Sequence, residues 1–494
     1  MSWKILNQSF FNKLSCFCCT YQLNWLAWRY RFAIIVWQPM FSSLNKNSSS
    51  MWGTLVLLIV AGEVIFALPF HITRFFRPTF LSVFQLNNTQ LGDMFAVYGV
   101  IAMVSYFPGG VIADRLPAKP LMIGSLLATA LGGLFLLTKP NAFELTCLFG
   151  YWGVTTILLF WSAMLKSIRL GANPNQQGRA FGVLDGGRGL IASLLASAAV
   201  LIFATITVDP NTSTVEQQKS ENIITSFNQV IIFYTAVTLC TALLLWRFWH
   251  PEDRTPEQIK TTPPHSGSIS KFQASIKVIL NSFKATASNS LVWLQAGIVV
   301  CAYCGYKSLD NYGVLVTDVY GWSQLESSQL TSALSYSRPF AAIVAGILAD
   351  RWRPSNIINL CFTLALIAFG LIAFSLLLNV NPSDSNTQDT LTTYLLIVNL
   401  FITALAVFAL RAVYFALLEE SHLAVHRTGM AIGLISFIGY TPDIFFASIT
   451  GRMLDSGEIS TGFVHYFYLM TAISVIGLCL GIFLVKKLNT KPYN

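Results

Sequence analysis

Long runs of apolar residues, separated by short polar loops, fill the chain from Met51 onward. Twelve of these runs are long enough to cross a bilayer as a helix, which takes about 20 mostly apolar residues. The predicted spans are 52–76, 91–113, 120–138, 142–165, 179–206, 223–246, 291–316, 327–349, 356–378, 393–418, 428–450 and 463–485. The pattern therefore predicts an all-α membrane protein with twelve transmembrane helices.

One connection is much longer than the others and divides the twelve spans into two sets of six. It is polar and contains Pro in the strings HPEDRTPEQIK and TTPPHSGS. We therefore expect an N-terminal six-helix bundle at 51–246, a linker at 247–290, a C-terminal six-helix bundle at 291–486 and a tail at 487–494.

Two polar turns carry the same residues at corresponding places in the two bundles. GVIADRLPAK begins at Gly110, GILADRWRPS begins at Gly346, and both contain Gly-x-x-Ala-Asp-Arg. A repeat of this kind indicates two equivalent halves. The strings resemble the signature loop of the major facilitator superfamily, which lies between helices two and three and recurs between helices eight and nine. The first string departs from the family pattern at Pro117 and Ala118, where Gly and Arg are common.

The resemblance implies two pseudosymmetric halves that rock against each other around a central cavity, lined mainly by spans one, four, seven and ten. In the family, the loop Asp caps a helix end and the Arg adds ionic contacts. A conformational latch is thus implied at Gly110, Asp114, Arg115, Gly346, Asp350 and Arg351.

The positions of the basic residues explain the formal charge of +9 without a nucleic-acid partner. With residues at span ends counted in the adjacent loops (Arg74 and Arg179), loops after even-numbered spans and the C-terminal tail hold 17 Lys and Arg, whereas loops after odd-numbered spans hold five. Because cytoplasmic loops carry the excess of Lys and Arg, we expect both termini and the linker in the cytoplasm. The strings at 177–189 and 439–443 resemble a bacterial branch of the superfamily, so we expect a multi-pass protein of the inner (plasma) membrane.

Residues 1–50 differ in composition from the rest of the chain. They carry five cations and no acidic residue, and the stretch Trp25–Phe41 is too short and too charged to cross a membrane. We favour a translation start at Met51, which would leave residues 1–50 untranslated. The alternative is an interfacial membrane anchor.

Several ionisable residues remain inside the predicted spans, where a charge costs roughly 2.5–3.5 kcal/mol on insertion scales. The cations are Arg188, Lys307, Arg338 and Arg411, and the carboxylates within or at the ends of spans are Glu63, Asp93, Asp185, Asp310 and Asp443. We expect at least two of the cations to face the substrate path. The alternative is that the charges pair across helices, or within span five between Asp185 and Arg188, which share a helix face.

The cations favour a small organic anion, because Arg binds carboxylate or phosphate groups bidentately. We expect substrate binding by Arg188, Lys307, Arg338, Arg411 and Tyr440, which precedes a helix break at Pro442. Glu63 has no cation within one helical turn in sequence. Desolvation would keep it protonated until the cavity opens to water. We therefore expect proton coupling at Glu63, with Asp185 and Asp443 as further candidates.

These features predict a secondary transporter that works by alternating access and couples a small organic anion or metabolite to protons. Anion exchange and drug or metabolite efflux are alternatives, and a transporter-like membrane sensor is a rival from another class. No GxxxxGK[ST], HExxH or GxSxG motif occurs, so we expect neither ATP-driven transport nor enzyme activity. The nine Cys are scattered along the chain and no His cluster at metal-ligand spacing accompanies them, so we expect no metal and no cofactor. The expected partners are the solute, protons and the lipid bilayer, and we expect a monomer.

Overall fold

The structure is a computed structural model that describes residues 49–171, 177–207, 216–249, 284, 286–378, 390–420 and 425–490. Residues Leu55–Asn494 form one compact unit, which is distinct from Met1–Thr54. The predicted extension up to residue 48, most of the predicted linker and the last four residues lie outside the described residues.

The described residues are almost entirely helical, and no strand occurs among them. Before the linker the elements are α2 (Ser49–Val64), η1 (Ala67–His71), α3 (Ile72–Phe75), α4 (Arg77–Val83), α5 (Asn88–Arg115), α6 (Ala118–Leu136), α7 (Ala142–Gly153), η2 (Val154–Trp161), α8 (Ser162–Gly171), α9 (Gln177–Thr207) and α10 (Glu216–Phe248). After it they are α12 (Ser290–Ser308), η5 (Leu309–Asn311), α13 (Tyr312–Asp318), α14 (Gln324–Ser335), α15 (Ser337–Arg351), α16 (Pro354–Leu378), α17 (Thr390–Val413), η6 (Tyr414–Ala416), α18 (Leu417–Glu420), α19 (Val425–Gly439), α20 (Pro442–Leu454) and α21 (Ile459–Asn489).

Helices occupy all twelve predicted spans, which confirms the all-α membrane fold. Among the described residues, nine helical stretches are long and apolar enough to cross a membrane. A tenth is counted if Gly53–Val64 and Ala67–Phe75, bent by 44°, form one span. The two predicted spans that do not reach this standard are α5 and the α12–α13 segment. Both contribute polar side chains to the cavity described below.

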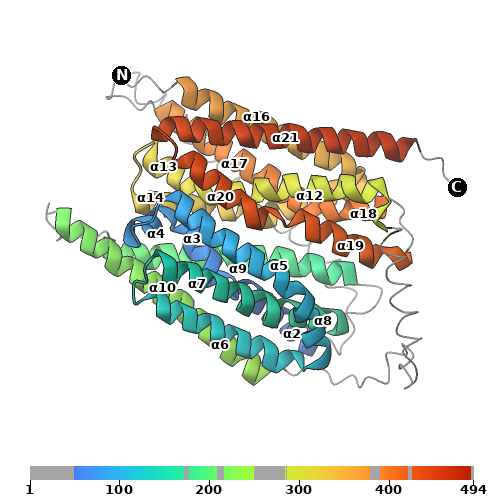
Figure 1. Ribbon diagram of the computed structural model, residues 1–494, viewed down its shortest axis with the longest axis horizontal. Coiled ribbons are helices and arrows are strands. Elements are labelled where there is room, and N and C mark those ends of the chain that lie inside the picture. The colour runs from blue at the N-terminus through green and yellow to red at the C-terminus, as the bar shows by residue number, and fades with distance from the viewer. Residues whose placement is uncertain are drawn as a thin grey trace, which may run out of the picture. The chain divides into compact units, whose positions relative to one another are not determined.

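Buried apolar side chains form separate cores before and after residues 250–283. Two clusters contain only buried residues from 58–249, including Trp152 and Phe203. Two others contain only buried residues from 291–484, including Tyr312 and Phe362. We call 55–249 the N-terminal half and 286–490 the C-terminal half. Their helices lie side by side in Figure 1, coloured blue to green and yellow to red.

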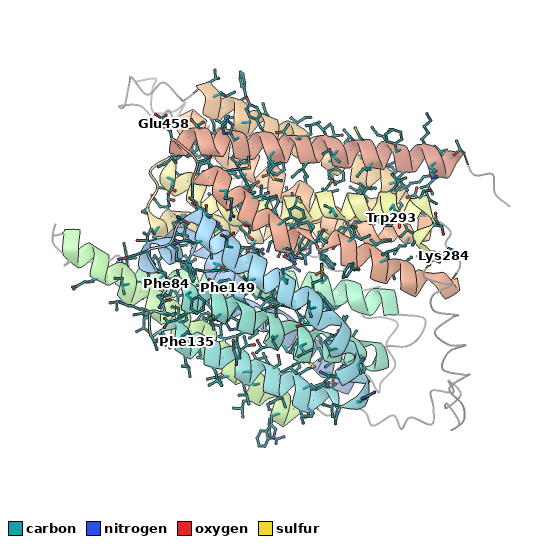
Figure 2. The ribbon with its side chains drawn as sticks, in the orientation of Figure 1. Phe84, Phe135, Phe149, Lys284, Trp293 and Glu458 are labelled. Atoms are coloured by element: carbon teal, nitrogen blue, oxygen red, sulfur yellow. The ribbon has the colours of Figure 1, made fainter. Side chains whose placement is uncertain are left out.

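The two repeated strings end their helices in the same way. Both α5 and α15 end at the Arg of Gly-x-x-Ala-Asp-Arg, followed by an extended residue, Leu116 or Trp352. One further residue, Pro117 or Arg353, then leads into α6 or α16. We call this the turn end of the molecule and the opposite one the far end. In Figure 2, Lys284 and Trp293 lie at the turn end of the C-terminal half and Glu458 lies at its far end.

Candidate functional site

A cavity of about 140 Å³ lies between the two halves, roughly midway along α5 and α9. The N-terminal half lines it with residues of α2, η1, α3, α5, η2 and α9, and the C-terminal half with residues of α12, α15, α17 and the α19–α20 region. It brings together most of the predicted binding and coupling residues: Glu63, Arg188, Lys307, Arg338, Arg411, Tyr440 and Asp443.

Glu63 is buried and contacts three basic groups. Its Oε1 lies 3.1 Å from His71 Nε2 and 3.7 Å from Arg338 Nη1. Its Oε2 lies 3.0 Å from Arg188 Nε as an ion pair, without the alignment of a hydrogen bond. The expectation that Glu63 lacks a nearby cation is therefore wrong. Its two Arg partners lie on α9 and α15. The spacing of residues within span one therefore could not reveal them.

Arg338 connects the two halves through carboxylates of the N-terminal half. Its Nη2 donates a hydrogen bond of 2.9 Å to Asp185 Oδ1 on α9. A methyl group at Gly189 would lie 3.0 Å from Arg338 Cδ, so this glycine leaves room for the side chain. The intrahelical pair of Asp185 with Arg188 does not form, because each side chain pairs with a residue of another helix.

Lys307 and Asp443 form a second ion pair on the C-terminal side of the cavity. Lys307 Nζ lies 3.1 Å from Asp443 Oδ1, and Tyr303 donates its hydroxyl to both oxygens of Asp443, at 3.1 and 3.0 Å. The predicted break at Pro442 is confirmed, since α19 ends at Gly439 and α20 begins at Pro442. The break places Asp443 in the first turn of a new helix, beside the cavity.

Arg74 is a cavity residue that the sequence reasoning assigned to a loop. It lies in α3, contacts the carboxylate of Asp310 in the other half, and donates a hydrogen bond of 2.6 Å to the Tyr306 hydroxyl. Counting it among the outer-loop residues is wrong, because it lies in α3, within the first predicted span 52–76. His71, eight residues after Glu63 in the same apolar run, is a further residue that was missed.

Arg411 is the basic residue of the cavity without a carboxylate partner among the described residues. Its Cζ lies 4.0 Å from the centroid of the Tyr306 ring and 6.0 Å from that of Tyr303. Its Nη1 is buried and donates no hydrogen bond to the described part of the chain. The other Arg and Lys side chains that line the cavity, Arg74, Arg188, Lys307 and Arg338, each contact a carboxylate. Arg411 is therefore the cavity cation that forms no ion pair with a described residue, although the carboxylate of Asp185 is near enough to attract it.

Aromatic rings form much of the cavity wall. They belong to Phe66, Phe70, Tyr98, Tyr106, Trp161, Tyr303, Tyr306 and Tyr440. Arg188 Cζ lies 5.5 Å from the Phe66 centroid and 5.4 Å from that of Trp161, and Lys307 Nζ lies 5.0 Å from that of Phe70. Such cation–π contacts hold the basic groups in place while their polar atoms stay available.

The far end is closed by contacts between α5 and α20. The Asp455 carboxylate accepts hydrogen bonds from the Asn88 backbone at 3.2 Å and the Thr89 backbone at 2.7 Å, so it caps a helix of the other half. A methyl group at Gly92 would overlap the backbone oxygen of Ala447. The two helices therefore touch backbone to backbone.

The predicted latch residues lie at the turn end, away from the cavity. Arg115 and Arg351 are exposed, and a methyl group at Gly110 or Gly346 would meet nothing within 4 Å. The side chains of Asp114 and Asp350 lie outside the described side chains.

Replacing Glu63 with Gln is expected to destabilise the protein rather than only to uncouple it. The change removes the charge that compensates Arg188 and Arg338, and breaking a buried ion pair costs about 3–5 kcal/mol. We expect a clear fall in the unfolding temperature of the purified protein. Glu221→Gln, at an exposed position of α10, is the matched control. An unchanged unfolding temperature in Glu63→Gln would show that Glu63 does not anchor the cluster.

An all-helical membrane protein with a polar cavity between two half-molecules has the architecture of a solute transporter. The chain belongs to the Major Facilitator Superfamily, whose family model matches residues 55–447. It is 25% identical over 445 residues to Inner membrane protein YihN of Escherichia coli (strain K12), covering 89% of this chain and 96% of YihN. It is 24% identical over 417 residues to Inner membrane protein YqcE of the same organism, covering 84% and 89%.

Solved structures show the same fold at low sequence identity. A bacterial homologue of the human lysosomal transporter Spinster, in an inward-facing and unoccupied conformation, matches with a TM-score of 0.62 and 14% identity, covering 91% of this chain and all of the homologue. The nucleoside transporter NupG matches with a TM-score of 0.61 and 12% identity, covering 89% and 99%. The resemblance drawn from the repeated turns is thus confirmed.

Proposed function

We propose that the protein is a secondary transporter that binds a small organic anion in the cavity between its halves. The observation that carries the proposal is Arg411, a half-buried side chain of the cavity wall that forms no ion pair with a described residue and whose Nη1 is buried without a hydrogen bond. A buried charge normally has a partner. An anionic solute supplies that partner while it is bound, and Arg188, Lys307, Arg338 and Tyr440 complete the binding site.

The size and wall of the cavity favour a compact solute with one ring. Its volume of about 140 Å³ is close to the roughly 150 Å³ of an engineered cavity that takes up benzene. The aromatic wall offers flat apolar surfaces on which a ring can stack. We therefore expect a cyclic monoanion, with its carboxylate, phosphate or sulfonate group at Arg411.

The closed far end fits one state of an alternating-access cycle. With the turn end in the cytoplasm, as the distribution of basic residues favours, a closed far end corresponds to the inward-facing state of that cycle. Opening the far end requires α5 and α20 to part, which breaks the cap of Asp455 on Asn88 and Thr89. The two halves then rock about the cavity, in the inner membrane and with both termini in the cytoplasm.

We include proton coupling in the proposal, but we assign Glu63 a positioning role and not the role of proton carrier. Its contacts with Arg188, Arg338 and His71 favour an ionised carboxylate that positions these side chains. Asp185 and Asp443 are also paired, but their side chains are 41% and 24% exposed, so water reaches them more readily. The proton carrier is therefore a residue other than Glu63.

Ligand-induced stabilisation tests the proposed substrate class without a transport assay. A solute that binds only the folded protein raises its unfolding temperature. We expect the purified protein to be stabilised by at least one cyclic monocarboxylate, phosphate or sulfonate, and not by the neutral amide or alcohol of the same ring. Equal stabilisation by the neutral analogue, or by nucleosides alone, would contradict an anion site.

Asp114→Asn is expected to reduce transport strongly while leaving the protein inserted and folded. The proposed latch needs the charge at this position, where α5 ends at the repeated turn. The rate of solute uptake into proteoliposomes measures the effect, and Asp350→Asn tests the equivalent turn of the other half. Normal uptake kinetics in correctly inserted Asp114→Asn would exclude the latch role.

A further inference from the structure

We propose that His71 is the residue that carries the coupled proton, and that its charge controls the contact between the halves. The inference deepens the proposed function, since it assigns a residue to the coupling step of a proton-linked transporter. It rests on one shared atom. Glu63 Oε1 contacts His71 Nε2 of its own half at 3.1 Å and Arg338 Nη1 of the other half at 3.7 Å.

His71 has one nitrogen engaged and one nitrogen available. Because a carboxylate only accepts hydrogen bonds, Nε2 carries the proton that it donates to Glu63. Nδ1 is buried and makes no hydrogen bond with any described residue. An imidazole is the side chain that ordinarily gains or loses a proton near neutral pH. A proton that bonds to the Nδ1 lone pair converts it to imidazolium, and the same N–H bond breaks when the proton leaves to water.

Two cavities give His71 access to water. It lines the main cavity and also a second one of about 30 Å³, which is bordered by Arg74, Ser335 and Arg338. A volume of about 10–15 Å³ already admits one water molecule. We infer that a water in the second cavity, which His71 borders, is the proton donor to the imidazole and that it does not pass through the substrate position.

A positive charge on His71 would act on the charged groups that surround it. Those that face it are Glu63 on α2, Arg74 on α3, Arg338 on α15 and the Tyr234 ring on α10, at 5.8 Å between centroids. Arg74 and Arg338 are the Arg residues of the cavity that pair with carboxylates of the opposite half, Arg74 with Asp310 and Arg338 with Asp185 and Glu63. A proton on His71 places a like charge beside both.

Protonation therefore redistributes the bonds of Glu63. The imidazolium forms a charge-assisted hydrogen bond to Oε1, stronger than that of the neutral ring. It repels Arg338, which loses part of its attraction to the same oxygen. Glu63 then pairs within the N-terminal half, the contact between halves weakens, and opening of the far end becomes easier. Loss of the proton restores the contact through Arg338.

A distance measurement across the far end tests this without a substrate. Spin labels are placed at Ser82 on α4 and Glu458 before α21, both exposed and on opposite halves, after replacement of the nine Cys. Pulsed electron paramagnetic resonance of the protein in lipid nanodiscs then measures the distance between the labels. A short distance reports molecules with the far end closed, and a long distance reports molecules with it open. We expect acidification to raise the open population by up to tenfold per pH unit, the limit for one titrating group. His71→Gln should remove this response.

His465→Gln, on an exposed position of α21, is the control and should keep the response. If His71→Gln does not fold, ¹⁵N-histidine resonances of the wild-type protein provide the second measurement, in which a buried imidazole must titrate over the same pH range. A response that survives in His71→Gln, or no response in the wild type, would overturn the proposal. A failed solute screen would instead leave the pH response intact and count only against the proposed substrate class.

Discussion

Arg411→Gln is expected to weaken binding of the organic anion strongly and to slow its uptake while leaving the fold intact. The change removes a guanidinium that has no carboxylate partner among the described residues, so no buried negative charge is left behind. A hydrogen bond to a charged group is worth about 1.5–3 kcal/mol, so affinity should fall roughly 10- to 100-fold. The affinity for an anion found in the stabilisation screen, measured by calorimetry, gives the result.

Two further variants make the Arg411 experiment specific. Arg411→Lys keeps the charge but loses the planar fork, so we expect intermediate affinity. Arg247→Gln changes an exposed Arg at the end of α10 and should bind as the wild type does. Full affinity in Arg411→Gln would contradict anion binding at Arg411 and would favour Lys307 or Arg188 as the binding residue. A lowered unfolding temperature in the absence of ligand would show that Arg411 has a structural role instead.

Gly92→Leu is expected to prevent closure of the far end and to reduce transport to the background of empty liposomes. In the closed arrangement α5 and α20 touch at Gly92, where even a methyl group would overlap the backbone oxygen of Ala447. A backbone atom cannot turn aside as a flexible side chain can, so the helices must separate. With the labels at Ser82 and Glu458, we expect the long-distance population to dominate at every pH.

Gly124→Leu is the matched control for the change at Gly92. A methyl group at Gly124 would meet nothing within 4 Å, and the residue is exposed on α6. We expect this variant to retain both the closed far end and normal transport. A closed far end in Gly92→Leu would show that the α5–α20 contact seen here does not govern the conformational equilibrium.

The helices were predictable from sequence because hydropathy and the repeated turns are local signals. Each apolar run of about 20 residues predicts one span by itself, and the two Gly-x-x-Ala-Asp-Arg strings mark equivalent turns of the two halves. The broken spans were harder to foresee. Pro442 marks the break before α20, and Pro69 lies inside the π-helical turn η1, but neither proline shows which side chains the break turns toward the cavity.

The pairing of the buried charges could not be read from the sequence. The four cations and their apolar surroundings predict a polar site, and all four line the cavity. Their partners depend on helix packing. In the sequence, no cation lies within one helical turn of Glu63. In the fold, Arg188 and Arg338 approach it from α9 and α15. Arg411, which resembles the other three cations in sequence context, is distinguished only by the carboxylate that it lacks among the described residues.

Solute accumulation in proteoliposomes tests the central claim most directly. The purified protein is reconstituted, and labelled cyclic monoanions are supplied outside with an inward proton gradient or at equal pH. The account predicts that at least one anion accumulates above its external concentration under the gradient, and that a protonophore removes this accumulation while exchange at equal pH continues. Accumulation of neutral solutes only, or anion accumulation that a protonophore does not change, would contradict it.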